Sequence, residues 1–150
     1  MSNNKTPIAS TKREISFVIW GDPVAQPRPR FFRAGAGIRS YDPAKEDKKS
    51  FAYTASQHAP ETPLTCPVVV KATFYLKRPK LHYRTGKNSD ILKADAPHIH
   101  SKRPDVDNFY KFFDCFEGIF WKDDAQVWDL HIKKVYSDKP RTEIKLEFYD

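Results

Sequence analysis

The chain has 150 residues, a formal net charge of +7 and a hydrophobic content of 39%, which together predict one folded domain and argue against a globally disordered chain. No apolar run is long enough to span a membrane, and the first residues lack the apolar core of a signal peptide. The two cysteines, Cys66 and Cys115, form no CxxC pair, so a cytoplasmic protein without a disulfide framework or a structural zinc is expected.

The first half of the chain predicts a tail, a strand, a hairpin and a helix. Residues 1–12 are expected to form a flexible tail ahead of a domain at 13–150, and the apolar residues 14–20 predict a strand. Residues 26–41 carry two glycines flanked by basic and aromatic residues, which predicts a hairpin or a broad basic loop. Asp42 and Pro43 suit an N-cap and a first helical position, so residues 43–59 are expected to be helical.

The second half predicts a strand, a long loop, a second helix and two more strands. A strand is expected at 66–79, with the alternating residues Val68, Val70, Ala72, Phe74 and Leu76 on one face. Residues 77–104 show no periodicity, and a loop of that length is usually functional or mobile. The last two strands alternate, with Trp128, Leu130, Ile132 and Tyr136, and then Ile144, Leu146 and Phe148, expected on one side. This order predicts a single small α/β or α+β domain, whose mixed, mostly sequential sheet packs with two main helices.

The charge is distributed unevenly along the chain. Residues 1–104 contain 19 basic and 8 acidic residues, a balance of +11, whereas residues 105–150 contain 7 and 11, a balance of −4. A basic surface attracts polyanions, of which nucleic acid is the usual one. A soluble protein with excess lysine would also be basic, but it would not account for the acidic residues gathered between positions 105 and 129.

The second predicted helix has one aromatic and one charged face. On a helix over 107–120 the five phenylalanines lie within about 100° of one another and should be buried, opposite Asp107, Lys111 and Asp114. The charged face has two structural interpretations. Asp107 and Lys111 could form an ion pair one turn apart on a solvated surface, or Asp105 and Asp107 could cap the helix.

A chemical interpretation depends on Asp123 and Asp124, which precede the next strand. A helix that packs on the sheet through its phenylalanines could bring its N-terminus close to this pair. Converging carboxylates repel one another unless protons or a hard cation lie between them. Mg²⁺ prefers oxygen ligands and can promote phosphodiester hydrolysis, while Lys111 could neutralise the scissile phosphate. An acidic site inside a basic surface therefore indicates a metal-dependent nuclease.

These residues resemble the signature of the RusA family of Holliday-junction resolvases, Asp-x-Asp-Asn-x-x-Lys followed by a helix and an Asp-Asp pair before a strand. The pattern is met here by Asp105, Asp107, Asn108, Lys111, Asp123 and Asp124, and the stretches "GDPVAQPRPRF" and "SYDP" resemble the opening segments of many members. Residues 77–104 depart from the family pattern, which bears on junction and sequence preference more than on chemistry.

The resemblance implies a small homodimeric endonuclease of RusA-like mixed α/β fold that uses Mg²⁺ or Mn²⁺ and cuts four-way DNA junctions symmetrically, in recombination and repair. It implies that Asp105, Asp107 and Asp124 bind the metal, that Asp123 assists, and that Lys111 is required for cleavage. Members of the family are often encoded by phages and prophages.

The basic residues predicted to contact DNA lie in two segments. Arg28, Arg30, Arg33 and Arg39 could follow phosphates while Phe31, Phe32 and Tyr41 stack on opened bases near a branch point, although these phenylalanines could equally belong to the core. A second set flanks the acidic motif and is better placed for backbone contact: Lys77, Arg78, Lys80, Arg84, Lys87, Lys102 and Arg103.

Three functions are compatible with the sequence. The first is a junction endonuclease, the second is a nuclease with a broader preference for flaps or forks, and the third is a non-catalytic basic nucleic-acid-binding module. A zinc site built from His98, His100 and Asp105 is not favoured, because no further cysteine or histidine completes it.

Overall fold

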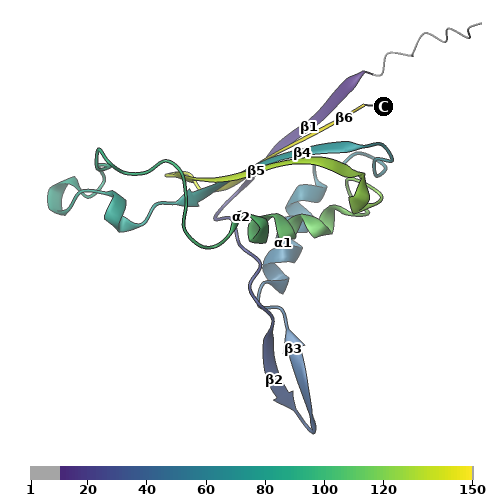
Figure 1. Ribbon diagram of the computed structural model, residues 1–150, viewed down its shortest axis with the longest axis horizontal. Helices are drawn as coiled ribbons and strands as arrows, with labels where there is room; N and C mark the ends of the chain where they lie inside the picture. The colour runs from purple at the N-terminus through teal and green to yellow at the C-terminus, as the bar shows by residue number, and fades with distance from the viewer. Residues whose placement is uncertain (1–10, 150) are drawn as a thin grey trace, which may run out of the picture.

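A computed structural model describes residues 11–149, and they form the single small α+β domain that the sequence predicts. Figure 1 shows a sheet with both helical segments on one of its faces, and a hairpin that projects away from this body. Residues 1–10, most of the predicted tail, and residue 150 lie outside the described range, and the first strand already begins at Lys12. No helix among residues 11–149 combines the length and apolar character needed to cross a membrane.

The main sheet has four strands in the order β1-β6-β4-β5, so the expected sequential order is wrong. The strands are β1 (Lys12–Trp20), β4 (Val68–Lys77), β5 (Val127–Ser137) and β6 (Arg141–Tyr149). The last strand lies between the first strand and β4 and is antiparallel to both, whereas β5 runs parallel to β4. A parallel pair needs a long crossover connection, and the loop and helix of residues 78–126 provide it.

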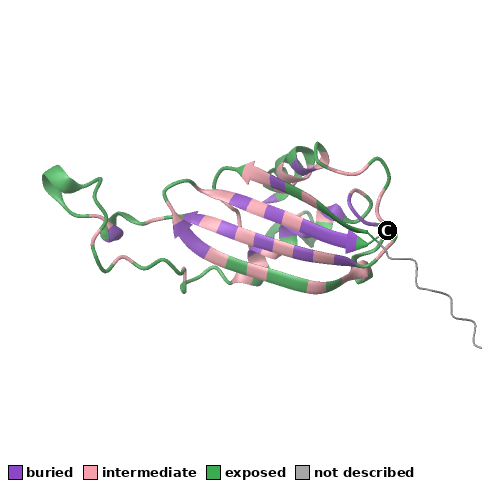
Figure 2. Ribbon diagram, turned by 90° about the horizontal axis from the view of Figure 1, so that it is seen from above, coloured by how far each residue is buried: buried purple, intermediate pink, exposed green. Residues whose placement is uncertain are grey.

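One face of this sheet forms the hydrophobic core, as the alternation predicts. Along β4 the side chains of Val68, Val70, Ala72, Phe74 and Leu76 are all buried, and the intervening residues are more exposed (Figure 2). Ile144, Leu146 and Phe148 of β6 are buried as well, which confirms that strand. In β5 the register places Leu130, Ile132 and Tyr136 on the face of Val70, Ala72 and Leu76, as predicted, although Leu130 is 41% exposed on this edge strand. The prediction is wrong for Trp128, which lies at a register shift between Val68 and Val69 and is 68% exposed.

Two helical segments cover the core face. The helix α1 (Lys45–Ser56) confirms the first predicted helix, but its N-cap is Ala44 and not Asp42. The second is the α-helix α2 (Val106–Tyr110), which continues as a 3₁₀ helix, η3 (Lys111–Phe116), and thus ends before the predicted residue 120. Three residues per turn place Phe113 and Phe116 one above the other, and their ring centroids are 4.7 Å apart.

The predicted phenylalanine stripe is confirmed and anchors the second helical segment. Phe109, Phe112, Phe113, Phe116 and Phe120 are all buried. The ring of Phe109 lies 5.4 Å from that of Phe74 in β4, and the ring of Phe120 lies 5.5 Å from that of Phe17 in β1. Phe116 stacks on Phe51 of α1 at 5.7 Å. The aromatic packing therefore holds α2 and its acidic face in a defined position on the sheet.

Three further pieces of structure bear on the site. The predicted hairpin is confirmed as β2 (Arg30–Ala34) and β3 (Gly37–Tyr41), with Gly35 at φ 61° as the first residue of its tight turn. The loop of residues 78–103 projects from one end of the sheet and contains two short 3₁₀ turns, η1 (Lys80–His82) and η2 (Gly86–Asn88) (Figures 1 and 2). A third turn, η4 (Asp124–Gln126), leads into β5.

Candidate active site

The first acidic pair lies at the start of α2. Asp105 is in the N-cap position but makes no capping bond with its side chain, and Asp107 lies in the first turn. Both carboxylates are exposed, and neither has a hydrogen-bond or ion-pair partner among residues 11–149. Lys111 does not pair with Asp107, because its Nζ donates to Oδ1 of Asn108 at 3.1 Å. The predicted ion pair is therefore wrong. The capping interpretation is confirmed for the position of Asp105 but not for a capping bond, so both carboxylates are open to a ligand.

The loop that leads into Asp105 is held by Lys134 of β5. This lysine faces the helices, in register with Phe74 of β4, and its Nζ donates to the carbonyl oxygens of Lys102 and Pro104, the latter at 2.6 Å. Lys134 was not among the site residues predicted from the sequence. Its signal was a lysine at an inward position of an otherwise apolar alternation.

The segment that contains His98 and His100 attaches the same loop to β5 at a second place. The backbone N–H of Tyr136 donates to the carbonyl oxygen of His98 at 2.9 Å, and the backbone N–H of His100 donates to the carbonyl oxygen of Lys134 at 3.3 Å. The His100 ring packs on the Tyr136 ring, and burial, followed by the charge of Lys134, lowers the pKa of His100 below its ordinary value. Residues 98–104 thus run along the edge of β5, which positions Asp105.

The two aspartates of the second acidic pair, Asp123 and Asp124, have different roles. The side chain of Asp123 caps η4 by accepting from the backbone of Ala125 at 2.8 Å, and the side chain of Gln126 accepts from the backbone of Asp123 at 2.8 Å. This capping box gives Asp123 a structural role that was not predicted from the sequence. Asp124 accepts instead from the indole nitrogen of the buried Trp121 at 2.8 Å, which orients its carboxylate and leaves the other oxygen available.

Asp124 lines a pocket of about 290 Å³ between η3 and the start of β5, together with Asp114, Tyr110 and Trp128. Burial, followed by the negative charges of Asp124 and Asp114, raises the pKa of Tyr110 to about 12. The phenol therefore stays neutral at physiological pH and can donate a hydrogen bond. Asp114 was not among the predicted site residues, although its spacing from Asp107 and Lys111 on the charged helix face was a signal for it.

The carboxylates do not converge as expected. Among residues 11–149 no three or more histidine, cysteine, aspartate or glutamate side chains are placed to hold a metal ion, so Asp105, Asp107 and Asp124 form no such group. Asp124 lies near Asp114, and Asp107 precedes Tyr110 of the same pocket by about one helical turn. Mg²⁺ commonly takes only one or two protein carboxylates, with water and substrate phosphate completing its shell. These exposed oxygen donors fit an open site of that kind.

A basic pocket of about 460 Å³ lies beside the Asp105 loop. His100 and Tyr136 line this pocket. It is also lined by five basic residues that were predicted to contact DNA: Lys77, Arg78, Lys80, Lys102 and Arg103. The guanidinium of Arg78 lies 5.5 Å from the centre of the Tyr136 ring and donates to the carbonyl of Pro97 at 2.7 Å, which fixes its position. Arg84 and Lys87 are exposed in the projecting loop and do not line this pocket. The structure thus places concentrated positive charge two residues from Asp105.

The remaining predicted DNA contacts lie on the hairpin or, in the case of Arg28, just before it. Arg28, Arg30, Arg33 and Arg39 are all exposed. Phe31 and Phe32 are 72% and 47% exposed, so the interpretation of these phenylalanines as core residues is wrong. The predicted basic residues therefore form two separate surfaces, one in the pocket near Asp105 and one on the projecting hairpin.

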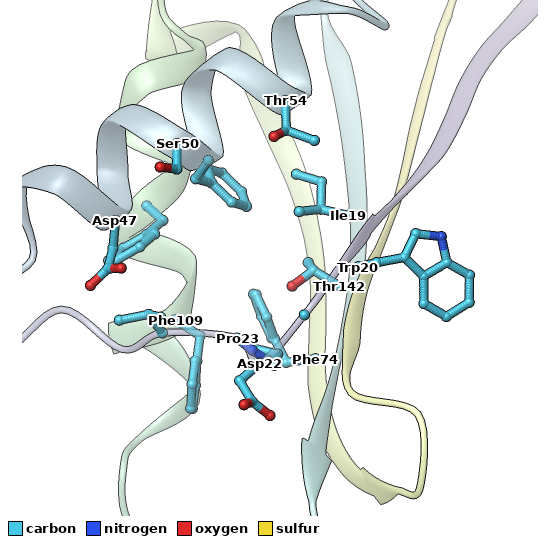
Figure 3. A pocket seen from close by; sticks show the side chains of 14 residues that line it. Ile19, Trp20, Asp22, Pro23, Asp47, Ser50, Thr54, Phe74, Phe109 and Thr142 are labelled. Carbon is cyan, nitrogen blue, oxygen red and sulfur yellow. The ribbon is translucent and has the colours of Figure 1, made fainter.

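A further pocket of about 190 Å³ lies between α1 and the segment after β1 (Figure 3). Asp22, Asp47 and Ser50 lie at its polar rim, and Phe74 and Phe109 form part of its apolar wall. None of the predicted site residues lines it. It therefore belongs to the packing of α1 against the body and not to the acidic motif.

Comparison with known proteins assigns the family. The model of the family described as endodeoxyribonuclease RusA matches residues 21–147, a range that includes every predicted site residue. The chain is also 38% identical over 136 residues to the uncharacterized protein YqaN of Bacillus subtilis (strain 168), covering 88% of this chain and 94% of that protein. The motif at the start of α2, the Asp-Asp pair before β5 and the basic surfaces all lie in the matched range. The chain therefore belongs to the RusA endodeoxyribonuclease family.

Proposed function

We propose that the protein is a Mg²⁺- or Mn²⁺-dependent endodeoxyribonuclease that resolves four-way DNA junctions by paired, symmetric cuts. Family membership supports this activity. The observation that carries it is the position of two exposed, unpartnered carboxylates, Asp105 and Asp107, directly beside the basic pocket that contains Arg103. Exposed carboxylates can bind a hard cation, and the adjacent basic pocket can bind a phosphate, so the two features together suit a metal-dependent nuclease.

Substrate positioning is proposed for the basic pocket. Lys77, Arg78, Lys102 and Arg103 would bind backbone phosphates on one side of the Asp105 loop, so that the next phosphodiester lies over the start of α2. Lys111, oriented by the side chain of Asn108, would neutralise charge that develops on the scissile phosphate. Phosphate contacts of this type supply affinity and register without reading the base sequence.

Metal binding is proposed for Asp105, Asp107 and Asp124, with Asp123 contributing only the oxygen that its capping bond leaves open. When bound, Mg²⁺ supplies activation of water and stabilisation of the leaving oxygen. Trp121 would hold the Asp124 carboxylate in orientation through the 2.8 Å bond from its indole nitrogen. Asp114 adds negative charge to the same pocket, and the neutral Tyr110 offers a donor to a phosphate oxygen.

A homodimer is proposed because of the substrate. A four-way junction has approximate two-fold symmetry, and two symmetric cuts are made most simply by two copies of one site related by the same symmetry. One subunit would then cut each of two opposite strands.

The test is to incubate the protein with a labelled synthetic four-way junction, a linear duplex of matched sequence and a flap, each with Mg²⁺ and with EDTA. We expect paired nicks in the junction that are absent in EDTA and weak on the duplex. Equal cutting of the flap would assign a broader branched-DNA nuclease. Binding without cutting in either Mg²⁺ or Mn²⁺ would contradict the proposal and favour a non-catalytic DNA-binding module.

Loosening the Asp105 loop should slow cleavage without weakening DNA binding. In Lys134→Met the carbonyls of Lys102 and Pro104 lose their charged donor, so the loop should sample other positions. We expect the single-turnover rate on the junction to fall about ten-fold, because catalytic groups tolerate little displacement. The control is Lys133→Met, which removes the same charge from the opposite face of β5. Equal rates for the two variants would contradict a positioning role for Lys134.

A further inference from the structure

The geometry points to the β2–β3 hairpin as an arm that enters the branch point of the DNA junction, with Phe31 and Ile38 contacting unstacked bases and the hairpin arginines contacting the phosphates around them. This inference rests on the proposed function and specifies how a junction is distinguished from a linear duplex.

The surface of the arm favours a polyanion. Residues 23–41 contain four arginines, Arg28, Arg30, Arg33 and Arg39, and no acidic residue. All four arginines are exposed, and none of them has an ion-pair partner among residues 11–149. A partner that complements this surface must be negatively charged along its length, and a DNA backbone meets that requirement.

The arm also carries apolar side chains that the body does not cover. The register pairs Phe31 with Ser40 and Arg33 with Ile38, so these four side chains share one face of the ribbon. Phe31 and Ile38 are 72% and 73% exposed, the highest values among the large hydrophobic residues of the hairpin. Exposed apolar groups of this size on a projecting ribbon indicate a binding surface.

The opposite face provides a contrast within the same ribbon. Phe32 and Tyr41 lie there with ring centroids 6.0 Å apart, and each is 47% exposed. These two rings partly cover each other and support the hairpin. Phe31 and Ile38 are therefore the side chains available to a ligand.

DNA offers a matching surface for both features. A two-stranded ribbon fits the major groove, and an aromatic side chain can stack on a base that is no longer stacked on its neighbour. Such bases are accessible at a branch point, whereas in a linear duplex each base is covered on both sides. An exposed face of the ribbon that carries Phe31, Ile38 and arginine thus selects branched DNA over linear DNA.

The root of the arm is clamped to the acidic motif. The backbone of Gln26 donates to the carbonyl of Asn108 at 2.8 Å, and the side chain of Gln26 donates to Asp42 at 3.0 Å. Asp42 also accepts from the backbone of Ala44 at 2.9 Å and from Nζ of Lys48 at 2.7 Å. The bond from Lys48, and then that from Ala44, lower the pKa of Asp42 to about 2, so the clamp stays ionised at neutral pH.

This clamp joins both strands of the hairpin to the site. Gln26 precedes β2, Asp42 follows β3, and Asn108 directly follows Asp107 in α2. The direction of the arm relative to Asp107 is therefore set by short hydrogen bonds. One junction centre held by the arm would place its flanking phosphates at a constant distance from the carboxylates.

The test compares the double variant Phe31→Ala/Ile38→Ala with Tyr53→Ala, a matched control that removes an aromatic side chain 72% exposed on α1. Affinities are measured in EDTA for a four-way junction and for a linear duplex of the same sequence. We expect the double variant to bind the junction about ten-fold or more weakly, with less than a two-fold change on the duplex. The control should match the wild type on both substrates.

A second measurement reports the contact itself. With 2-aminopurine at the centre of the junction, wild-type protein should change the probe fluorescence as the base leaves its stack, and the double variant should not. Unchanged junction affinity together with an unchanged fluorescence response would overturn the inference. So would an equal loss of affinity on junction and duplex, and so would conversion of a dimer into a monomer, because the arm would then contact a second copy of the chain.

The two proposals fail in different ways. A wild-type protein that binds and unstacks the junction but cuts nothing in Mg²⁺ or Mn²⁺ would overturn the proposed function and leave the arm intact. A double variant that binds, unstacks and cuts the junction like the wild type would overturn the arm alone. Circular dichroism of each variant confirms that the substituted protein remains folded.

Discussion

Replacing Asp107 by asparagine is expected to abolish cleavage of a four-way junction while its binding stays equal or becomes tighter. The substitution keeps the shape of the side chain and removes its charge, so a hard cation loses a ligand and a nearby phosphate loses a repulsive neighbour. Because Asp107 is exposed and has no partner among residues 11–149, stability should change by no more than about 0.5 kcal/mol.

The rate should fall by at least about a hundredfold, since even residues that only orient a metal ligand can have that effect. Single-turnover cleavage in Mg²⁺ and fluorescence anisotropy in EDTA measure the two quantities separately. Asp105→Asn should behave in the same way, and Asp138→Asn, an exposed aspartate in the turn after β5, is the control. Mg²⁺-dependent cutting at wild-type rates by both motif variants would remove Asp105 and Asp107 from the site.

Replacing Phe116 by alanine is expected to lower the free energy of unfolding by about 3–5 kcal/mol, the usual range for a buried phenylalanine. Phe116 is fully buried, and its ring lies 4.5 Å from Phe120, 4.7 Å from Phe113 and 5.7 Å from Phe51 and Trp121. The loss is a large share of the 5–15 kcal/mol that stabilises a typical domain.

Urea denaturation followed by circular dichroism measures this change. Phe31→Ala is the matched control, because the same side chain is removed from an exposed position on the hairpin and should alter stability by no more than about 0.5 kcal/mol. A loss below about 1.5 kcal/mol in Phe116→Ala would show that the aromatic cluster does not hold the second helical segment on the sheet. Since Trp121 also orients Asp124, a variant that remains folded should still show slower cleavage.

Local patterns in the sequence were sufficient to predict much of the secondary structure and its buried faces. The alternation of β4, the phenylalanine stripe of α2 and η3, and the glycine-containing turn of the hairpin all follow from the geometry of a single segment, so they could be predicted from residue spacing. The acidic motif was recognisable for the same reason, because its carboxylates, asparagine and lysine lie within seven consecutive residues, 105–111.

The order of the strands was not predictable from such patterns. Backbone hydrogen bonds differ little among residue types, so the alternation within β1 and β6 does not predict that the first strand pairs with the last. The ion pairs that join them, such as Lys145 with Glu14 at 3.2 Å, can be identified only when the strands are adjacent. The parallel pairing of β4 and β5 depends on how the intervening 78–126 segment packs. The change from α-helix to 3₁₀ helix at Lys111 also has no local signature and accompanies the stacking of aromatic rings from three elements.

The roles of the individual site residues were likewise decided by tertiary structure. The spacing alone could not separate Asp123, whose side chain caps a turn, from Asp105, whose side chain makes no such bond. Lys134 acts on a loop 30 residues away in sequence, and Gln26 joins the hairpin to Asn108. The sequence by itself thus determined which chemical groups are present and which faces are apolar, because those depend on neighbours along the chain. Tertiary structure decided which groups meet, because hydrogen bonds and ion pairs depend on distances that only the packed sheet and helices set.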